Sequence, residues 1–120
     1  METRLLIRGE QVEGEGTGLA VENPATEENL TELRGASPEQ LDSAVAGARE
    51  AARGWAATPA VERAEMLHEV ATRMRAMTDD LARTLTSEGG KPLIENRDEL
   101  GWTAAAFDYY AEMGRNSPVA

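Results

Sequence analysis

One segment, Glu88-Gly89-Gly90-Lys91-Pro92, separates two helical patterns and contains the single lysine of the 120 residues. Glycine commonly ends a helix, and proline suits the first turn of the next one. A phosphate-binding loop would need a Ser or Thr after the lysine and a buried strand before the glycines. Because Pro92 follows the lysine and a helical pattern precedes the glycines, the segment predicts a helix-to-helix turn with an exposed lysine.

Helical periodicity lies on both sides of this turn. The upstream pattern starts at Thr58-Pro59, and Thr58 is expected as a helix cap. This pattern fits either one helix or two helices separated at Thr78-Asp79-Asp80. The downstream pattern starts at Pro92 and is expected to end near residues 114–118. The apolar stripes comprise, upstream, Met66, Leu67, Val70, Met74, Met77, Leu81 and Leu85, and downstream, Leu93, Arg97, Leu100, Ala104, Phe107 and Ala111.

An earlier helix begins at the capping box Ser37-Pro38-Glu39-Gln40, and its apolar stripe comprises Leu41, Val45, Ala48, Ala52 and Trp55. Before it, short apolar runs at residues 5–7, around Val12, and at 19–22 and 29–33 predict strands, with a loose, mobile loop at 13–18. We therefore expect one α+β region, residues 1–120, with a β-hairpin and short strands in 1–34 and three to four amphipathic helices in 37–115.

The composition excludes several classes of function. With 22 acidic and 12 basic residues the formal net charge is -10, which disfavours nucleic acid and anionic membranes as partners. The sequence shows no apolar run long enough to span a membrane and no export signal, so the cytoplasm is the expected location. It contains no cysteine, and therefore no disulfide, thiolate metal site or cysteine nucleophile.

The remaining chemistry-bearing residues favour structural interpretations. His68 is the single histidine, and its sequence neighbours Glu65 and Glu69 are typical of a solvated helix face. No Ser or Thr has a base at a plausible spacing, so no catalytic residue is assigned. The aromatic residues of the last helix do not share one face, which favours packing against a surface outside this chain; they are Trp102, Phe107, Tyr109 and Tyr110.

In their order these segments resemble the N-terminal part of the aldehyde dehydrogenase superfamily. The resemblance rests on Ile7-Arg8-Gly9-Glu10, Asn23-Pro24-Ala25-Thr26, Trp55, Arg63, Glu88-Gly89-Gly90-Lys91-Pro92 and Tyr109-Tyr110-Ala111. Two positions depart from the family pattern: Gln11 replaces a usual aromatic residue, and Glu27 replaces a glycine. The second departure would strain its turn if that position needs a positive φ.

The resemblance implies oxidation of an aldehyde to a carboxylic acid, by a cysteine thiolate and hydride transfer to NAD or NADP. It also implies that this chain is truncated before the cofactor and catalytic motifs. On that interpretation the chain alone binds no cofactor, is inactive, and needs a second polypeptide or self-association. A stand-alone helical interaction module and a non-functional gene remnant are the alternatives.

Two positions acquire roles from the resemblance alone. Trp102 falls where the family places an apolar side chain at the substrate entrance, and Glu88 falls where some members help to hold a monovalent cation. Their structural alternatives are a packing residue and a charge beside a helix end.

Overall fold

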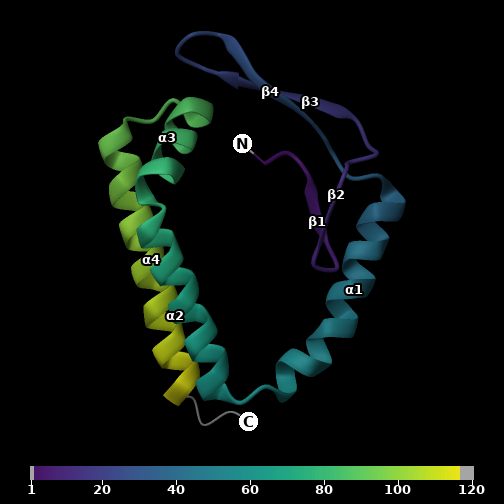
Figure 1. The fold of residues 1–120 in the computed structure, drawn as a ribbon, viewed down its shortest axis with the longest axis vertical. Coiled ribbons are helices and arrows are strands. Elements are labelled where there is room, and N and C mark those ends of the chain that lie inside the picture. Colours follow the sequence, from purple (N-terminus) through teal and green to yellow (C-terminus); the bar gives the residue numbers. More distant parts are fainter. Residues whose placement is uncertain (1, 117–120) are drawn as a thin grey trace. The chain divides into compact units, whose positions relative to one another are not determined.

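The computed structural model describes residues 2–116, which divide into two compact units, residues 2–57 and 58–116. The first unit holds β1 (Leu5–Ile7), β2 (Glu10–Val12), β3 (Gly18–Asn23), β4 (Glu28–Arg34) and α1 (Pro38–Ala57). The second holds α2 (Ala60–Ala76), α3 (Thr78–Gly89) and α4 (Leu93–Asn116) (Figure 1). This arrangement confirms the expected α+β class, with short strands followed by four helices.

The strands form two separate antiparallel hairpins. In the first, Ile7 pairs with Glu10, so the turn consists of Arg8 and Gly9 alone, with φ of 55° and 84°. Positive φ at both central residues is the mark of a type I′ turn, whose twist matches that of the strands. In the second, β3 pairs with β4 from Gly18↔Arg34 to Asn23↔Glu28, with an irregularity between Val21 and Glu22.

The turn between β3 and β4 is built on Asn23. Its side-chain Oδ1 accepts a hydrogen bond from the amide of Ala25 at 3.0 Å, and its carbonyl accepts one from the amide of Glu27 at 2.8 Å. Glu27 has φ of 61°, so the strain expected at this departure from the family pattern is confirmed.

The glycine-rich loop 13–18 is held by hydrogen bonds, so the expectation of a loose loop is wrong. The amide of Gly16 donates to the carbonyl of Gly35 at 2.8 Å, and a Cβ on Gly14 would lie 2.0 Å from the carbonyl oxygen of Arg34. The predicted capping box of α1 also holds this loop: Gln40 Nε2 donates to the carbonyl of Glu13 at 2.8 Å, while Ser37 Oγ accepts from the Gln40 amide at 3.2 Å. Glycine at these positions permits the close approach of two backbone segments.

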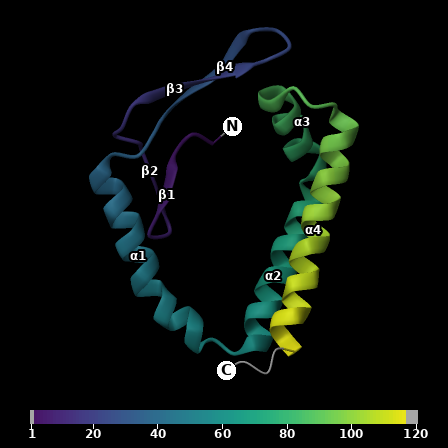
Figure 2. The ribbon, with the colours of Figure 1, turned by 180° about the vertical axis from the view of Figure 1, so that it is seen from behind.

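In the second unit, α2 and α4 lie side by side along their length in both views (Figures 1 and 2). Alanines fill the contact: Ala64 and Ala71 of α2 and Ala104 and Ala111 of α4 are at most 2% exposed. Small side chains spaced by seven residues let the two helix backbones approach closely, so larger apolar residues lie beside this seam instead of within it.

The predicted core stripes are therefore partly wrong. In α2 the alanines are buried, whereas Met66 and Val70, and Met77 just after the helix, are exposed. In α4 the predicted stripe included Arg97, but the buried residue is its neighbour Asn96, which is 3% exposed. Arg97 is half-buried, and its Nε lies 2.9 Å from Oδ1 of Asp79. The error in α4 is a rotation of one residue, about 100° around the helix.

Helix ends agree with the predicted signals except at Thr58. The N-cap of α2 is Pro59 and not the predicted Thr58. The carbonyl of Thr58 instead accepts a hydrogen bond from Arg63 Nη1. The break that the sequence left open at 78–80 exists and lies at Met77. Helix α4 ends at Asn116, so Ser117 and Pro118 of the predicted end lie outside the described residues. Among the described helices, none combines the length and apolar character needed to cross a membrane.

Candidate functional site

The turn at residues 89–92 is organised by one buried side chain. Gly90 ends α3 with φ of 73°, and its amide donates to the carbonyl of Thr86 at 2.9 Å. Asn96, in the second turn of α4, donates from Nδ2 to Thr86 Oγ1 at 2.8 Å and to the carbonyl of Lys91 at 3.2 Å. The segment is therefore a helix-to-helix turn, as predicted, and the amide of Asn96 fixes its path.

Lys91 is half-buried, which corrects the prediction of an exposed lysine. Its ammonium forms an ion pair with Glu99 and lies 4.0 Å from Glu95, both on α4. The ammonium is therefore paired with carboxylates of its own chain.

Glu88, the predicted cation ligand, lies exposed in the last turn of α3. Among residues 2–116, no three His, Asp or Glu side chains are arranged to hold a metal ion. Glu88 thus has no companion ligands within the described residues, and its cation role stays a prediction.

The described residues also lack a unit that fits a dinucleotide. Both sheets found in residues 2–116 are antiparallel hairpins, so the described part of the chain has no strand-helix-strand unit to place a pyrophosphate at a helix N-terminus. The glycines of loop 13–18 serve backbone approach to residues 34–36.

Trp102, the predicted entrance residue, is 71% exposed on α4. Tyr109 and Met113 follow it at spacings of seven and four residues, so the three lie on one exposed face. Tyr110 meets Tyr109 edge to face, with ring centroids 5.3 Å apart. This face carries residue types that are enriched at protein interfaces, and the entrance role of Trp102 stays a prediction.

An apolar pocket of about 200 Å³ lies between α2 and α4; its lining residues are Leu67, Thr103, Ala106, Phe107 and Tyr110. Its size suits one apolar side chain and is well below the volume of ordinary small-molecule sites.

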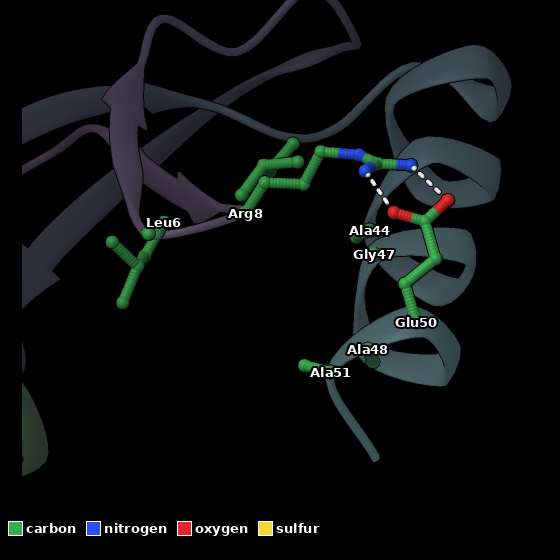
Figure 3. A pocket seen from close by; sticks show the side chains of 9 residues that line it. Leu6, Arg8, Ala44, Gly47, Ala48, Glu50 and Ala51 are labelled. Atoms are coloured by element: carbon green, nitrogen blue, oxygen red, sulfur yellow. Dashed lines mark hydrogen bonds and ion pairs between the residues drawn. The ribbon is translucent and has the colours of Figure 1, made fainter. Parts of the chain in front are cut away.

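A second pocket, of about 520 Å³, lies between the first hairpin and α1 (Figure 3). Figure 3 shows Arg8 reaching across to Glu50, with Arg8 Nη1 and Glu50 Oε2 2.6 Å apart. The guanidinium lowers the pKa of the Glu50 carboxyl. Leu6 also lines this pocket and is 72% exposed, so the hairpin presents apolar surface beside the ion pair.

The most connected polar cluster joins α2 to α4 and was missed by the sequence interpretation. His68 Nδ1 lies 2.6 Å from Asp108 Oδ1, and His68 Nε2 lies 2.8 Å from Glu112 Oε1. Arg75 Nη2 lies 2.5 Å from the other oxygen of Asp108. The hydrogen bonds that His68 donates to Asp108 and to Glu112, the first having the larger effect, raise the pKa of His68. The hydrogen bonds that Asp108 accepts from Arg75 and then from His68 lower the pKa of Asp108.

A sequence signal for this cluster exists. Asp108 and Glu112 are four residues apart and share a helix face, and His68 and Arg75, seven residues apart, share another. Predicting the cluster also requires knowing that this face of α4 meets this face of α2, and that depends on how the alanines pack.

Apolar side chains remain uncovered in both units. Helix α1 has no buried residue in its 20 positions, and its predicted stripe is open at Leu41, Val45 and Trp55. In the second unit the exposed large apolar residues are Val61, Met66, Val70, Met77, Leu85, Ile94, Trp102, Tyr109, Tyr110 and Met113. Such faces suit binding to protein surface better than solvation.

Comparison with known proteins shows the same region in longer enzymes. A family model described as the aldehyde dehydrogenase family matches residues 11–118. The 4-(hydroxymethyl)benzenesulfonate dehydrogenase TsaD1 of Comamonas testosteroni is 41% identical over 112 residues, which are 92% of this chain and 24% of that protein. The NADP(+) succinate-semialdehyde dehydrogenase GabD of Escherichia coli strain K12 is 34% identical over 111 residues, 92% of this chain and 23% of that protein.

Solved structures give the same result. An aldehyde dehydrogenase from Brucella melitensis biovar abortus 2308 matches with a TM-score of 0.91 at 32% identity, over 95% of this chain and 24% of its own. An NAD-dependent benzaldehyde dehydrogenase from Corynebacterium glutamicum matches with a TM-score of 0.92 at 26% identity, over 98% of this chain and 27% of its own. The chain thus spans about a quarter of the length of the relatives it matches.

Proposed function

This chain belongs to the aldehyde dehydrogenase family, and we propose that it serves as the N-terminal portion of an NAD(P)-dependent enzyme that oxidises an aldehyde to a carboxylic acid. One observation carries the proposal: residues 11–118 match the family model, and 95% of the chain superimposes on an aldehyde dehydrogenase with a TM-score of 0.91. Relatives named for NAD and for NADP both match, so either cofactor is compatible with the proposal. A cytoplasmic location is part of it, and fractionation of cells that express the chain tests that part.

We further propose that these 120 residues do not oxidise an aldehyde by themselves. They contain no cysteine to supply the thiolate that the family resemblance implies. Catalysis then needs the remaining part of the family fold, and we propose that a second polypeptide supplies it. The exposed stripe of α1 and the exposed face of α4 are the surfaces that this polypeptide would cover, since burial of apolar area drives most protein association.

The experiment mixes the purified chain with a candidate polypeptide holding the cysteine-containing remainder of the fold. The substrates are succinate semialdehyde and benzaldehyde, the aldehydes of two relatives, and the readout is the absorbance of reduced NAD or NADP. We expect turnover from the mixture and none from either chain alone. A mixture that forms no complex and gives no turnover contradicts the proposal.

A pair of variants on α1 sharpens this test. Val45 is 51% exposed on the apolar stripe, and Ala46 is exposed about 100° further around the helix. Val45→Glu should weaken the complex and lower turnover, whereas Ala46→Glu should leave both unchanged. Equal effects of the two substitutions would mean that the α1 stripe is not the covered surface.

A stand-alone interaction module is the second candidate, and the second unit favours it. The seam between α2 and α4 closes without help from another chain, and every buried side-chain nitrogen and oxygen in residues 2–116 has a hydrogen-bond partner. A monomeric, cooperative unfolding transition of the isolated chain, together with no gain of turnover on mixing, would favour this candidate over the enzyme.

A further inference from the structure

We propose that His68 is a pH-sensitive latch, in which an imidazolium held between Asp108 and Glu112 keeps α2 and α4 together and loss of its proton loosens the last turns of α4. The proposal concerns regulation of the helix pair and does not depend on aldehyde oxidation.

The argument starts from the two ring nitrogens. A neutral imidazole has one N–H donor and one lone pair, whereas the imidazolium has two donors. Here both nitrogens face carboxylate oxygens, at 2.6 Å and 2.8 Å. A neutral ring would place its lone pair against one of these oxygens, so the two contacts coexist as hydrogen bonds only when both nitrogens are protonated.

The neighbouring charges decide which contact fails when the proton leaves. Asp108 keeps its ion pair with Arg75, at 2.5 Å, whatever the state of the ring. Within residues 2–116, the one other cation paired with Glu112 is Arg115, at 3.8 Å on its own helix. On α2, Glu69 is occupied by Arg73 at 2.7 Å, and Glu65 lies one turn before the ring. Deprotonation therefore releases Glu112 first, which loosens the last turns of α4 against α2 while the alanine seam stays packed.

The latch lies beside the apolar pocket of about 200 Å³ between the same helices. Leu67 of that pocket precedes His68, and Phe107 precedes Asp108. A change in the spacing of α2 and α4 at the latch would therefore change the width of the pocket, which couples pH to an apolar binding surface.

The titration of the single histidine sets how the stabilisation of the α2–α4 pair changes with pH. An unperturbed imidazole titrates near pH 6.5, and the two carboxylates raise the pKa of His68. The stabilisation is complete below about pH 6.5 and is lost as the pH rises through the folded-state pKa. Because the chain has one histidine and no cysteine, few other groups titrate in this range.

The test is an NMR titration of the full chain, which follows the one imidazole and the amides of the last turns of α4. We expect the pKa of His68 to lie above about 6.5. At pH values above that pKa, the amides of these turns should exchange faster, after correction for intrinsic exchange. Glu112→Gln and Asp108→Asn should each lower the pKa of His68. Glu65→Gln is the control and should leave the pKa unchanged. An imidazole that titrates at or below about 6.5 in the chain overturns the proposal, as does a chain that shows no helical α2–α4 pair.

A second measurement guards against loss of folding in one variant. His68→Gln keeps hydrogen bonding but cannot gain the charge, so its urea midpoint should lack the fall that the wild type shows between mildly acidic and mildly alkaline pH. A wild-type midpoint that does not fall, or a fall of equal size in His68→Gln, overturns the latch.

Discussion

In the described part of the chain, two non-glycine residues have left-handed backbone: Arg8, with φ of 55°, and Glu27, with φ of 61°. A side chain at such a position costs about 1–2 kcal/mol, which glycine avoids at the expense of greater freedom in the unfolded chain. Glu27→Gly should therefore raise the free energy of unfolding by roughly 0.5–1 kcal/mol. Urea denaturation measures this change.

Arg8→Gly provides the contrast to Glu27→Gly. It relieves the same backbone strain but removes the ion pair with Glu50, so the two effects oppose each other and little net gain is expected. A gain as large as that of Glu27→Gly would mean that the Arg8–Glu50 pair adds nothing to stability.

Gly14 gives a prediction of the opposite sign. A Cβ there would lie 2.0 Å from the carbonyl oxygen of Arg34, a backbone atom that cannot move without disturbing β4. Gly14→Ala should destabilise the chain by about 3 kcal/mol, at the upper end of ordinary substitutions. Gly18→Ala is the matched control, because nothing lies within 4 Å of its Cβ, and it should change stability by less than about 0.5 kcal/mol. Thermal unfolding of both variants decides whether the close approach of the loop to β4 matters.

At the scale of elements, the sequence predicted the strands and helices of the described residues but left open whether α2 and α3 are separate. These predictions succeeded because the turns carry their own chemistry. Gly9, Asn23, Ser37 with Gln40, and Gly90 each mark a boundary, and the structure moves those boundaries by one or two residues. These signals act between residues close in sequence, where backbone sterics and short hydrogen bonds suffice.

The contacts between elements were harder to predict from the sequence. His68 meets carboxylates 40 and 44 residues away, and Asn96 replaces Arg97 in the buried stripe by a one-residue rotation. Both features follow from which helix faces meet. The apolar pattern pointed to the large side chains of α2, whereas alanines make the contact. Large apolar residues dominate a sequence pattern even when, as here, they do not pack within the described structure.

The alanine seam itself can be tested at this scale. Ala104 is fully buried between α4 and α2, so Ala104→Leu forces the helices apart and should cost about 1–3 kcal/mol. Ala105 is exposed on the next position, and Ala105→Leu should change stability by less than about 0.5 kcal/mol. Chemical denaturation followed by circular dichroism compares the two. Similar costs for both substitutions would mean that the helices do not pack through the seam.

For the whole molecule, apolar surface and charge act against each other. Exposed apolar residues occur in both units, including Trp55 at 48% and Trp102 at 71%, while the net charge of -10 keeps copies of the chain apart. Acidification towards the isoelectric point near 4.5 protonates enough carboxylates to bring the net charge close to zero, which removes this repulsion. We therefore predict that light scattering by the isolated chain rises as the pH falls from neutral towards this range.

Unfolding is separable from this association. Ion pairing lowers the pKa of Asp108 and of Glu50, so the stability they contribute is present above their unfolded values near about 4 and is lost only as the pH falls through the lower folded values. Association should thus begin while the helical circular dichroism is unchanged. The double variant Trp55→Gln and Trp102→Gln keeps the net charge and removes apolar area, so its association should start at lower pH. If that variant scatters light at the same pH and to the same extent, the exposed aromatic faces do not drive association.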